Sequence, residues 1–196
     1  MRTNRNTCFE TFPFPEGLTP ADTAHQQTEA IEGGALIPAG IPAVSAGISA
    51  SNMPLAQAIH AQAAMKSIAT RTVLRTHAEA IARAAKRLND LREAWLNPPE
   101  WTERVPEVIP LGMQTSPYPD RIVARGGHEK DLADRTLTRL YNQRPAWLDA
   151  AHKALDLAVA AAYGWADYTA DMPDEEILKR LLALNLARAR VTSSAC

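Results

Sequence analysis

The stretch TVLRTHAEAIARAAKRLNDLREAWL, residues 72–96, decides the fold. Its larger apolar residues recur every seven positions, at Leu74, Ile81, Leu88 and Trp95. Residues at this spacing share one face of an α-helix, and the charged residues of the stretch fall mostly on the opposite face. Asn97-Pro98-Pro99 ends the pattern, because proline disfavours helical geometry in the residue before it and has no amide hydrogen to donate. The stretch therefore predicts a long amphipathic helix that packs in a helical hairpin or a short coiled coil.

Three further helices are predicted downstream, after a proline-rich connector over residues 98–119. The first is short and covers about residues 129–142. The second begins at Pro145, which suits the first position of a helix, and ends at Gly164, which suits its C-cap. The third begins near Pro173, with acidic residues in its first turn and arginines at its end. These charge signs complement a helix dipole at both ends.

Upstream of the long helix the composition changes. Residues 1–17 alternate phenylalanine with proline, which predicts a short extended segment that runs into a turn. Residues 18–70 are rich in Ala, Gly, Pro and Ser, and only their part from 55 to 68 has the pattern of an alanine-rich helix. The predicted fold is therefore mainly α. A helical bundle or hairpin over residues 71–191 follows the extended segment and a loosely ordered insert.

The chain shows no features of a secreted, disulfide-bonded or membrane protein. Cys8 and Cys196 lie at opposite ends, so they predict neither a disulfide framework nor a metal site, and the five histidines also lack ligand spacing. The basic N-terminus leads into Phe9-Glu10-Thr11-Phe12 and not into an apolar secretory core. No charged residue lies between Glu32 and Lys66, but prolines and glycines break the run that a spanning helix of about 20 apolar residues needs. We expect a cytoplasmic protein without a membrane span.

The charges of the chain are nearly balanced, with 21 Lys+Arg against 22 Asp+Glu and a formal net charge of -1. A domain dedicated to nucleic-acid binding is usually clearly basic. The balance argues against such a domain, although it leaves room for a part of a larger DNA-binding protein.

A set of short strings, taken in order, resembles a known family. The strings are Cys8-Phe9-Glu10-Thr11-Phe12-Pro13-Phe14-Pro15, Leu88-Asn89-Asp90-Leu91-Arg92-Glu93-Ala94-Trp95-Leu96-Asn97-Pro98-Pro99, Tyr118-Pro119-Asp120-Arg121-Ile122-Val123, Arg135-Thr136-Leu137-Thr138, Leu140-Tyr141-Asn142, Arg144-Pro145-Ala146-Trp147-Leu148, Ala161-Ala162-Tyr163-Gly164-Trp165 and Met172-Pro173-Asp174-Glu175-Glu176-Ile177-Leu178. Their order and spacing over residues 5–17 and 71–190 resemble the C-terminal end of the class I S-adenosylmethionine-dependent DNA methyltransferases of the MmeI-like type.

The resemblance implies an adenine-specific enzyme of a restriction-modification or phage-defence system. The whole protein would bind S-adenosylmethionine, flip an adenine out of the duplex and methylate its amine. Its cofactor-binding and catalytic residues would precede residue 1, so the resemblance assigns this chain no catalytic residue and no cofactor. Residues 1–17 would form the exit of the target-recognition region, residues 18–70 an insertion, and residues 71–191 the C-terminal helices. These would support target recognition and DNA binding.

Two motifs resemble catalytic or cofactor-binding motifs but lack the features that these require. Amino-methyltransferases hold the flipped base with an Asn/Asp-Pro-Pro-aromatic loop, but Asn97-Pro98-Pro99-Glu100 has a glutamate where a ring must stack. This string also follows a helix and not a strand, so it predicts helix termination. The glycines between Gly33 and Gly47 lack the tight spacing of a cofactor loop. They predict a flexible segment.

Arginines of the helical region are candidates for contact with DNA phosphates, which supply affinity without reading sequence. The candidates are Arg83, Arg87, Arg121 and Arg125. The alternative for the same residues is an ordinary solvated helix face. Tyr163 and the tryptophans at 95, 147 and 165 fall on apolar stripes or caps, which indicates core positions and not base-stacking platforms.

A second hypothesis comes from a different class of protein. The chain would be a stand-alone helical interaction or dimerisation module with no enzymatic activity. It would self-associate through the stripe of Leu74, Ile81, Leu88 and Trp95, because an exposed apolar patch favours association.

Overall fold

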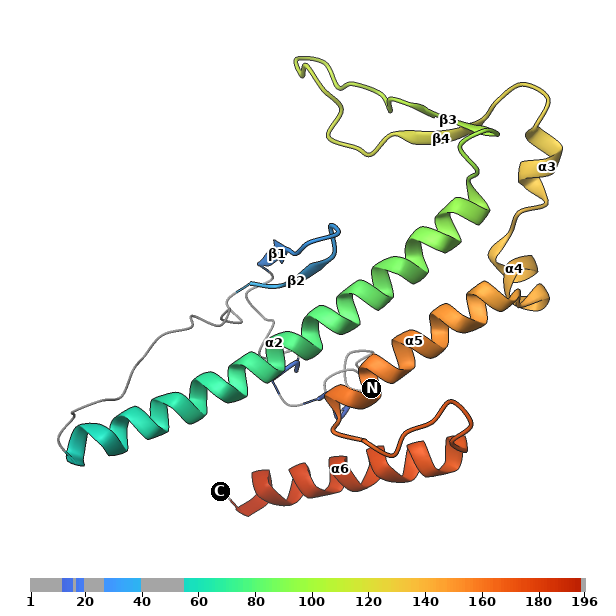
Figure 1. The fold of residues 1–196 in the computed structure, drawn as a ribbon. Coiled ribbons are helices and arrows are strands. Elements are labelled where there is room, and N and C mark those ends of the chain that lie inside the picture. Colours follow the sequence, from blue (N-terminus) through green and yellow to red (C-terminus); the bar gives the residue numbers. More distant parts are fainter. Residues whose placement is uncertain (1–11, 16, 20–26, 40–54, 195–196) are drawn as a thin grey trace, which may run out of the picture. The chain divides into compact units, whose positions relative to one another are not determined.

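The computed structural model describes residues 12–15, 17–19, 27–39 and 55–194, with side chains over residues 72–190 of the last range. The helices within these residues are α2 (Leu55–Leu96), α3 (Glu129–Ala133), α4 (Leu137–Gln143), α5 (Ala146–Ala162) and α6 (Asp174–Ser194) (Figure 1). The strands are β1 (Thr28–Ala30), β2 (Leu36–Pro38), β3 (Thr102–Val105) and β4 (Arg121–Ala124), which form two separate antiparallel pairs. The mainly α fold predicted from the sequence is confirmed.

The chain divides into two compact units. The first unit comprises residues 1–84 and 155–196, and the second comprises residues 85–154. Helices α2 and α5 each contribute residues to both units. The buried core of the first unit includes Ala35, Ile37, Ala78 and Ala160, and that of the second includes Leu88, Leu140, Leu148 and Ala151.

The long helix α2 begins earlier than the heptad pattern predicts. It starts at Leu55 and joins the alanine-rich stretch to the amphipathic one in a single helix of 42 residues. Neither glycine nor proline interrupts the sequence between its ends, and alanine has the highest helix propensity. The helix ends at Leu96, immediately before Asn97-Pro98-Pro99, so the predicted stop is confirmed.

A β-hairpin lies within the segment that the sequence predicts to be loosely ordered. Strands β1 and β2 pair with Glu29 opposite Ile37, and Gly33 and Gly34 take positive φ values of 88° and 74° in the turn between them. Glu29 accepts an ion-paired hydrogen bond from Arg75 of α2. The sequence did not predict this hairpin, because its strands have three residues each and one side chain is held by an arginine 46 positions away. Residues 20–26 and 40–54 of the same predicted insert, and residues 1–11 of the predicted extended segment, lie outside the described residues.

The second β-hairpin lies in the stretch predicted to be a connector. Thr102 pairs with Ala124 and Val105 with Arg121, and residues 106–120 connect the two strands. Thr102 is buried, and its Oγ1 donates to the carbonyl oxygen of Pro98 at 2.8 Å. This bond anchors the start of β3 to the turn that ends α2.

The helices after this hairpin follow the prediction with two corrections. The helix expected over residues 129–142 is interrupted after Ala133, because Thr136 caps a new helix by accepting from the backbone N–H of Arg139. Helix α5 ends at Ala162, and the predicted capping residue Gly164 follows in a Schellman motif, in which the amides of Gly164 and Trp165 donate to the carbonyls of Ala161 and Ala160. Helix α6 begins as expected with three acidic residues. It continues beyond Arg190 to Ser194, however, so its last turn carries no basic residue and the predicted cationic end is wrong.

Within the described residues, no helix combines the length and the apolar character that crossing a membrane requires.

Candidate functional site

The four arginines predicted to contact DNA fall into both units. Arg83 lies on the α2 part of the first unit, and its Nη2 donates to Glu79 Oε2 at 3.2 Å. Glu79 also accepts from Arg75 Nε at 2.9 Å. A carboxylate therefore already offsets the charge of Arg83, which makes it the weakest of the four as a phosphate ligand.

The other three predicted arginines belong to the second unit and are all exposed. Arg121 begins β4 and Arg125 follows the end of that strand. Arg125 Nε donates to the carbonyl oxygen of Thr102 at 2.8 Å, which fixes the direction of its side chain. Arg87 and Arg121 form no ion pair with any residue that the structure describes. Arg121 and Arg125 thus flank the residues of one short strand segment, the first at its start and the second immediately after its end.

The sequence analysis missed a further exposed arginine on the same hairpin. Arg104 lies on β3 opposite Ile122, and it also lacks an ion pair among the described residues. Arg104 and Arg125 both line a hollow of about 460 Å³, which Asn97 and Thr102 also border. The pairing of β3 with β4 unites these residues across more than 20 positions, so no local pattern could have revealed it.

Other basic residues of the second unit form local ion pairs. Arg139 pairs with Asp134 at 3.0 Å, and Arg144 pairs with Asp149 at 3.0 Å. Arg144 and Lys153 together lower the pKa of Asp149, with the hydrogen bond from Lys153 as the largest cause. These pairs have the character of an ordinary solvated surface, the alternative considered for the arginines.

The Asn97-Pro98-Pro99-Glu100 string serves as a turn. Asn97 Nδ2 donates to Glu93 Oε2 at 3.0 Å, and the carbonyl oxygen of Pro98 accepts from Thr102 Oγ1 and from the amide of Trp101. The Asn97 amide nitrogen and the Pro98 carbonyl oxygen are therefore engaged within the chain. The geometry fits the helix stop inferred from the sequence.

Arg135 lies between two indole rings of the second unit. Its guanidinium carbon is 5.0 Å from the ring centroid of Trp95 and 4.4 Å from that of Trp101. Its Nη1 donates to the carbonyl oxygen of Trp95 at 2.8 Å. The ring of His128 stacks on Trp101 with centroids 5.5 Å apart. We call Arg135, Trp95, Trp101 and His128 the Arg135 stack. Trp95 also belongs to the predicted association stripe, so this stripe residue already has contacts within the chain.

The rest of that stripe also has contacts or burial within the chain. A Cβ atom added at Gly17 would lie 2.5 Å from Leu74 Cδ1, so Leu74 packs closely on the Gly17 backbone. Ile81 lines a cavity of the first unit, and Leu88 is buried in the second. Self-association through this stripe stays a prediction, and it would use the exposed parts of Leu74, Ile81 and Trp95, since Leu88 is buried.

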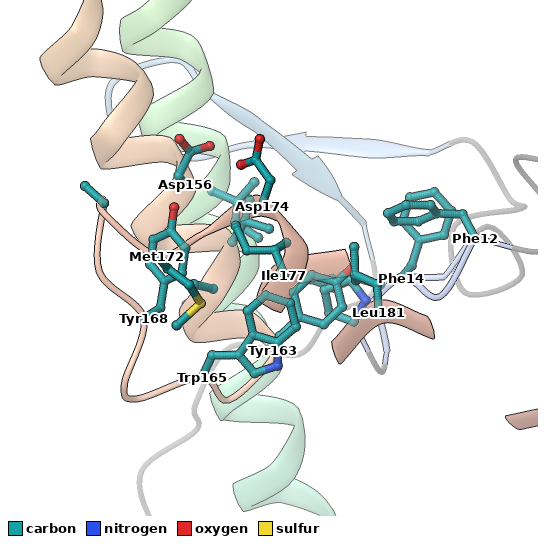
Figure 2. A pocket seen from close by; sticks show the side chains of 16 residues that line it. Phe12, Phe14, Asp156, Tyr163, Trp165, Tyr168, Met172, Asp174, Ile177 and Leu181 are labelled. Atoms are coloured by element: carbon teal, nitrogen blue, oxygen red, sulfur yellow. The ribbon is translucent and has the colours of Figure 1, made fainter. Parts of the chain in front are cut away.

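An aromatic cavity of about 700 Å³ lies in the first unit (Figure 2). Helices α5 and α6, the loop between them, the N-terminal segment and Ile81 of α2 supply its walls. The lining residues are Phe12, Phe14, Pro15, Leu18, Ile81, Asp156, Val159, Ala160, Tyr163, Trp165, Tyr168, Ala170, Met172, Asp174, Ile177 and Leu181.

Two pairs of rings form the aromatic end of this cavity. Phe12 and Phe14 meet edge to face with centroids 4.9 Å apart, and Tyr163 stacks on Trp165 at the same separation. Burial raises the pKa of the Tyr163 hydroxyl, and the nearby charge of Arg188 opposes that rise. The Schellman turn after α5 places the rings of Tyr163 and Trp165 side by side, so both residues at the end of this helix line the cavity.

The opposite end of the cavity is acidic. The carboxylates of Asp156 and Asp174 lie at the same end, away from Phe12 and Phe14 (Figure 2). Burial raises the pKa of the Tyr168 hydroxyl, and the charges of Asp156 and Asp174 raise it further. The phenol therefore stays protonated at neutral pH beside two carboxylates that form no ion pair with a described residue.

Arg180 supports the aromatic end from α6. Its guanidinium donates to both oxygens of Asp167, at 2.8 and 2.6 Å, and to Glu176 Oε1 at 2.9 Å. The guanidinium carbon is 5.5 Å from the ring centroid of Trp165. The hydrogen bonds from Arg180 lower the pKa of Asp167 to about 2. Arg180 is thus neutralised by its own partners.

The described residues contain no group of three or more His, Cys, Asp or Glu side chains that could hold a metal ion. Gly33 and Gly34 of the glycine run lie in the β1–β2 turn, and Gly40 and Gly47 lie outside the described residues. No protein-family model matches the chain, and no characterised protein or solved structure shows detectable similarity to it.

Proposed function

We propose that this chain is the C-terminal, non-catalytic part of a cytoplasmic, S-adenosylmethionine-dependent DNA adenine methyltransferase, where it supports target recognition and contacts the DNA backbone. The order and spacing of the strings between residues 5 and 190 carry the methyltransferase assignment. The exposed arginines of the β3–β4 hairpin carry the assignment of a DNA contact.

Exposure and available donor groups favour the hairpin arginines as phosphate ligands. Arg104 and Arg121 are exposed and have no carboxylate partner among the described residues, so binding a phosphate would break no ion pair. Arg125 is exposed, and its hydrogen bond to the Thr102 carbonyl uses only Nε. Its terminal nitrogens remain for a bidentate contact with phosphate oxygens.

The test is a titration of a short fluorescent DNA duplex with the chain at several salt concentrations. The triple variant Arg104→Ala, Arg121→Ala, Arg125→Ala should bind more weakly and lose about 0.9 from the log–log salt slope for each phosphate contact removed. The double variant Arg139→Ala, Arg144→Ala is the matched control, because each of these arginines already pairs with an aspartate. Equal slopes for all three proteins would contradict the proposed contact.

The methyltransferase assignment has a separate test. The DNA upstream of the codon for Met1 should encode an Asn-Pro-Pro-aromatic loop and a glycine-rich cofactor motif in one of its three frames. The purified chain should transfer no methyl group to DNA, since none of the required residues is assigned to it. An upstream region that encodes neither motif would remove the support for the assignment.

A helical interaction module remains the alternative, and an exposed leucine row on α6 favours it. Leu178, Leu182 and Leu186 recur every four residues and are 64%, 59% and 51% exposed. The expected partner of this leucine row is the same row on a second copy of the chain. Antiparallel pairing about Leu182 would place Leu178 against Leu186 of the partner copy, and it would bring Asp174 near the oppositely charged Arg190 of that copy.

Sedimentation at high protein concentration tests the alternative. A dimer that the Leu182→Glu substitution dissociates, and that Leu157→Glu leaves intact, would support association through α6. Leu157 is a fair control because it lies in the same unit and is 51% exposed. A dimer that survives Leu182→Glu would point to the stripe of Leu74, Ile81, Leu88 and Trp95. A monomer at every concentration would contradict the alternative.

A further inference from the structure

The aromatic cavity of the first unit has the size and the walls of a small-molecule site. Its volume of about 700 Å³ falls within the range of about 300–1,000 Å³ that such sites occupy. Most of its lining is aromatic or aliphatic, so a ligand must present an apolar body. The DNA contact proposed above lies in the other unit and makes no use of this cavity.

The charged groups of the cavity lie together and share one sign. Asp156 comes from α5, Asp174 is the first residue of α6, and Tyr168 lies in the loop between these helices. Figure 2 shows both carboxylates at one end of the cavity. Burial and the charges of Asp156 and Asp174 raise the pKa of the Tyr168 hydroxyl, which is a neutral donor at this end of the cavity.

Neither Asp156 nor Asp174 forms an ion pair with a residue that the structure describes. The guanidinium of Arg180 is bound to Asp167 and Glu176, and Arg188 acts on Tyr163, which lies at the aromatic end. Carboxylates at the edge of an apolar cavity favour a positively charged ligand group, and aromatic faces attract the same group through their quadrupoles.

We propose that the aromatic cavity binds a small organic cation, whose ammonium group lies beside Asp156 and Asp174 and whose apolar body packs among Phe14, Tyr163 and Trp165. A quaternary or alkylated ammonium suits the site better than a metal ion. It presents a diffuse charge to the ring of Tyr168 beside the carboxylates, and its carbon substituents fill apolar volume.

Calorimetric titration of the intact chain at low salt tests the proposal with three probes of similar size. Benzyltriethylammonium carries a positive charge, 7-phenyl-1-heptanol is neutral and 6-phenylhexanoate is negative. The cation should bind about tenfold more tightly than either comparison compound, a difference of about 1.4 kcal/mol. Equal affinity for the three probes, or no saturable binding of the cation, would overturn the proposal.

A pair of matched variants locates the charge that selects the cation. The double variant Asp156→Asn, Asp174→Asn should lose about tenfold in affinity for benzyltriethylammonium while keeping its affinity for the neutral probe. The double variant Asp171→Asn, Glu175→Gln removes two nearby exposed charges that do not line the cavity. This control should change the affinity by less than about twofold, because screened surface charges act weakly. An equal loss in both variants would overturn the assignment of the site. The selectivity of the unmodified chain for the cation tests the proposal without any variant.

Discussion

The Arg135 stack and the aromatic cavity are both clusters of aromatic rings, but they differ in what lies between the rings. Both gather aromatic rings that follow the end of a long helix, Trp101 after α2 and Trp165 after α5. In the stack, an arginine of the chain fills the space between the rings and bonds to a backbone carbonyl. In the cavity, the rings and two carboxylates surround about 700 Å³ that no side chain fills. A filled aromatic cluster stabilises the fold, whereas an unfilled one with charges of a single sign suits a ligand of the opposite charge.

The largest expected effect concerns the close packing of the unit that contains the stack. Leu148 is 1% exposed, so Leu148→Ala should lower the free energy of unfolding by about 3 kcal/mol through lost burial and a residual cavity. Urea denaturation followed by circular dichroism measures the change. Leu157→Ala is the control, because half of that side chain is already exposed and its loss should cost far less. Similar losses for both variants would show that the second unit is not tightly packed.

The next effect tests the stack itself. Arg135→Ala removes a cation from two indole faces and a donor from the Trp95 carbonyl, which should cost about 2 kcal/mol in unfolding free energy. Arg139→Ala removes the same side chain from an exposed pair with Asp134 and should cost less than about 1 kcal/mol. The two urea midpoints decide whether the stack stabilises the fold. Equal midpoints would make it a surface contact only.

A substitution that fills part of the cavity should raise the free energy of unfolding, whereas the two preceding substitutions lower it. Val159→Leu adds one methylene to a residue that lines the cavity, and burial of that group should stabilise the chain by about 0.8 kcal/mol. The same variant should weaken binding of benzyltriethylammonium, because it occupies part of the ligand volume. Thermal unfolding and calorimetry measure the two effects. A destabilised variant with unchanged binding would mean that this part of the cavity is not open to a ligand.

The smallest effect concerns the support of Trp165 by Arg180. Asp167 has a pKa of about 2 in the folded chain against an ordinary value of 3.8, so the folded state favours its charged form. Its contribution is fully present above pH 3.8 and is lost as the pH falls from 3.8 to about 2. Asp167→Asn should therefore flatten this part of the curve of stability against pH. An unchanged curve would contradict the ion pair with Arg180.

Local chemistry made much of the fold predictable. Asn97-Pro98-Pro99 ends α2, Gly164 ends α5, and the acidic turn after Pro173 begins α6, because each signal acts within a few residues of the boundary it sets. The β-hairpins could not be predicted, since their strands are only three or four residues long and their stability depends on distant partners such as Arg75 and Pro98.

The candidate sites were predictable only in part. Arg121 and Arg125 were identified by charge alone, while Arg104 joins them only through strand pairing. Tyr163 and Trp165 were recognised as cap or core residues, but the cavity also needs Phe14, which lies about 150 residues earlier in the sequence. Periodicity cannot bring such segments together. Tertiary packing of these segments forms the cavity, and the rings thereby become lining residues of a candidate ligand site as well as core or cap residues.

The most direct test of the account is the position of benzyltriethylammonium in its complex with the chain, measured by intermolecular nuclear Overhauser effects. We expect contacts from the ethyl groups to the ring of Tyr168 and from the phenyl group to the rings of Phe14 and Trp165. Ethyl contacts confined to Phe12 and Phe14, or contacts only to residues outside the cavity, would contradict it.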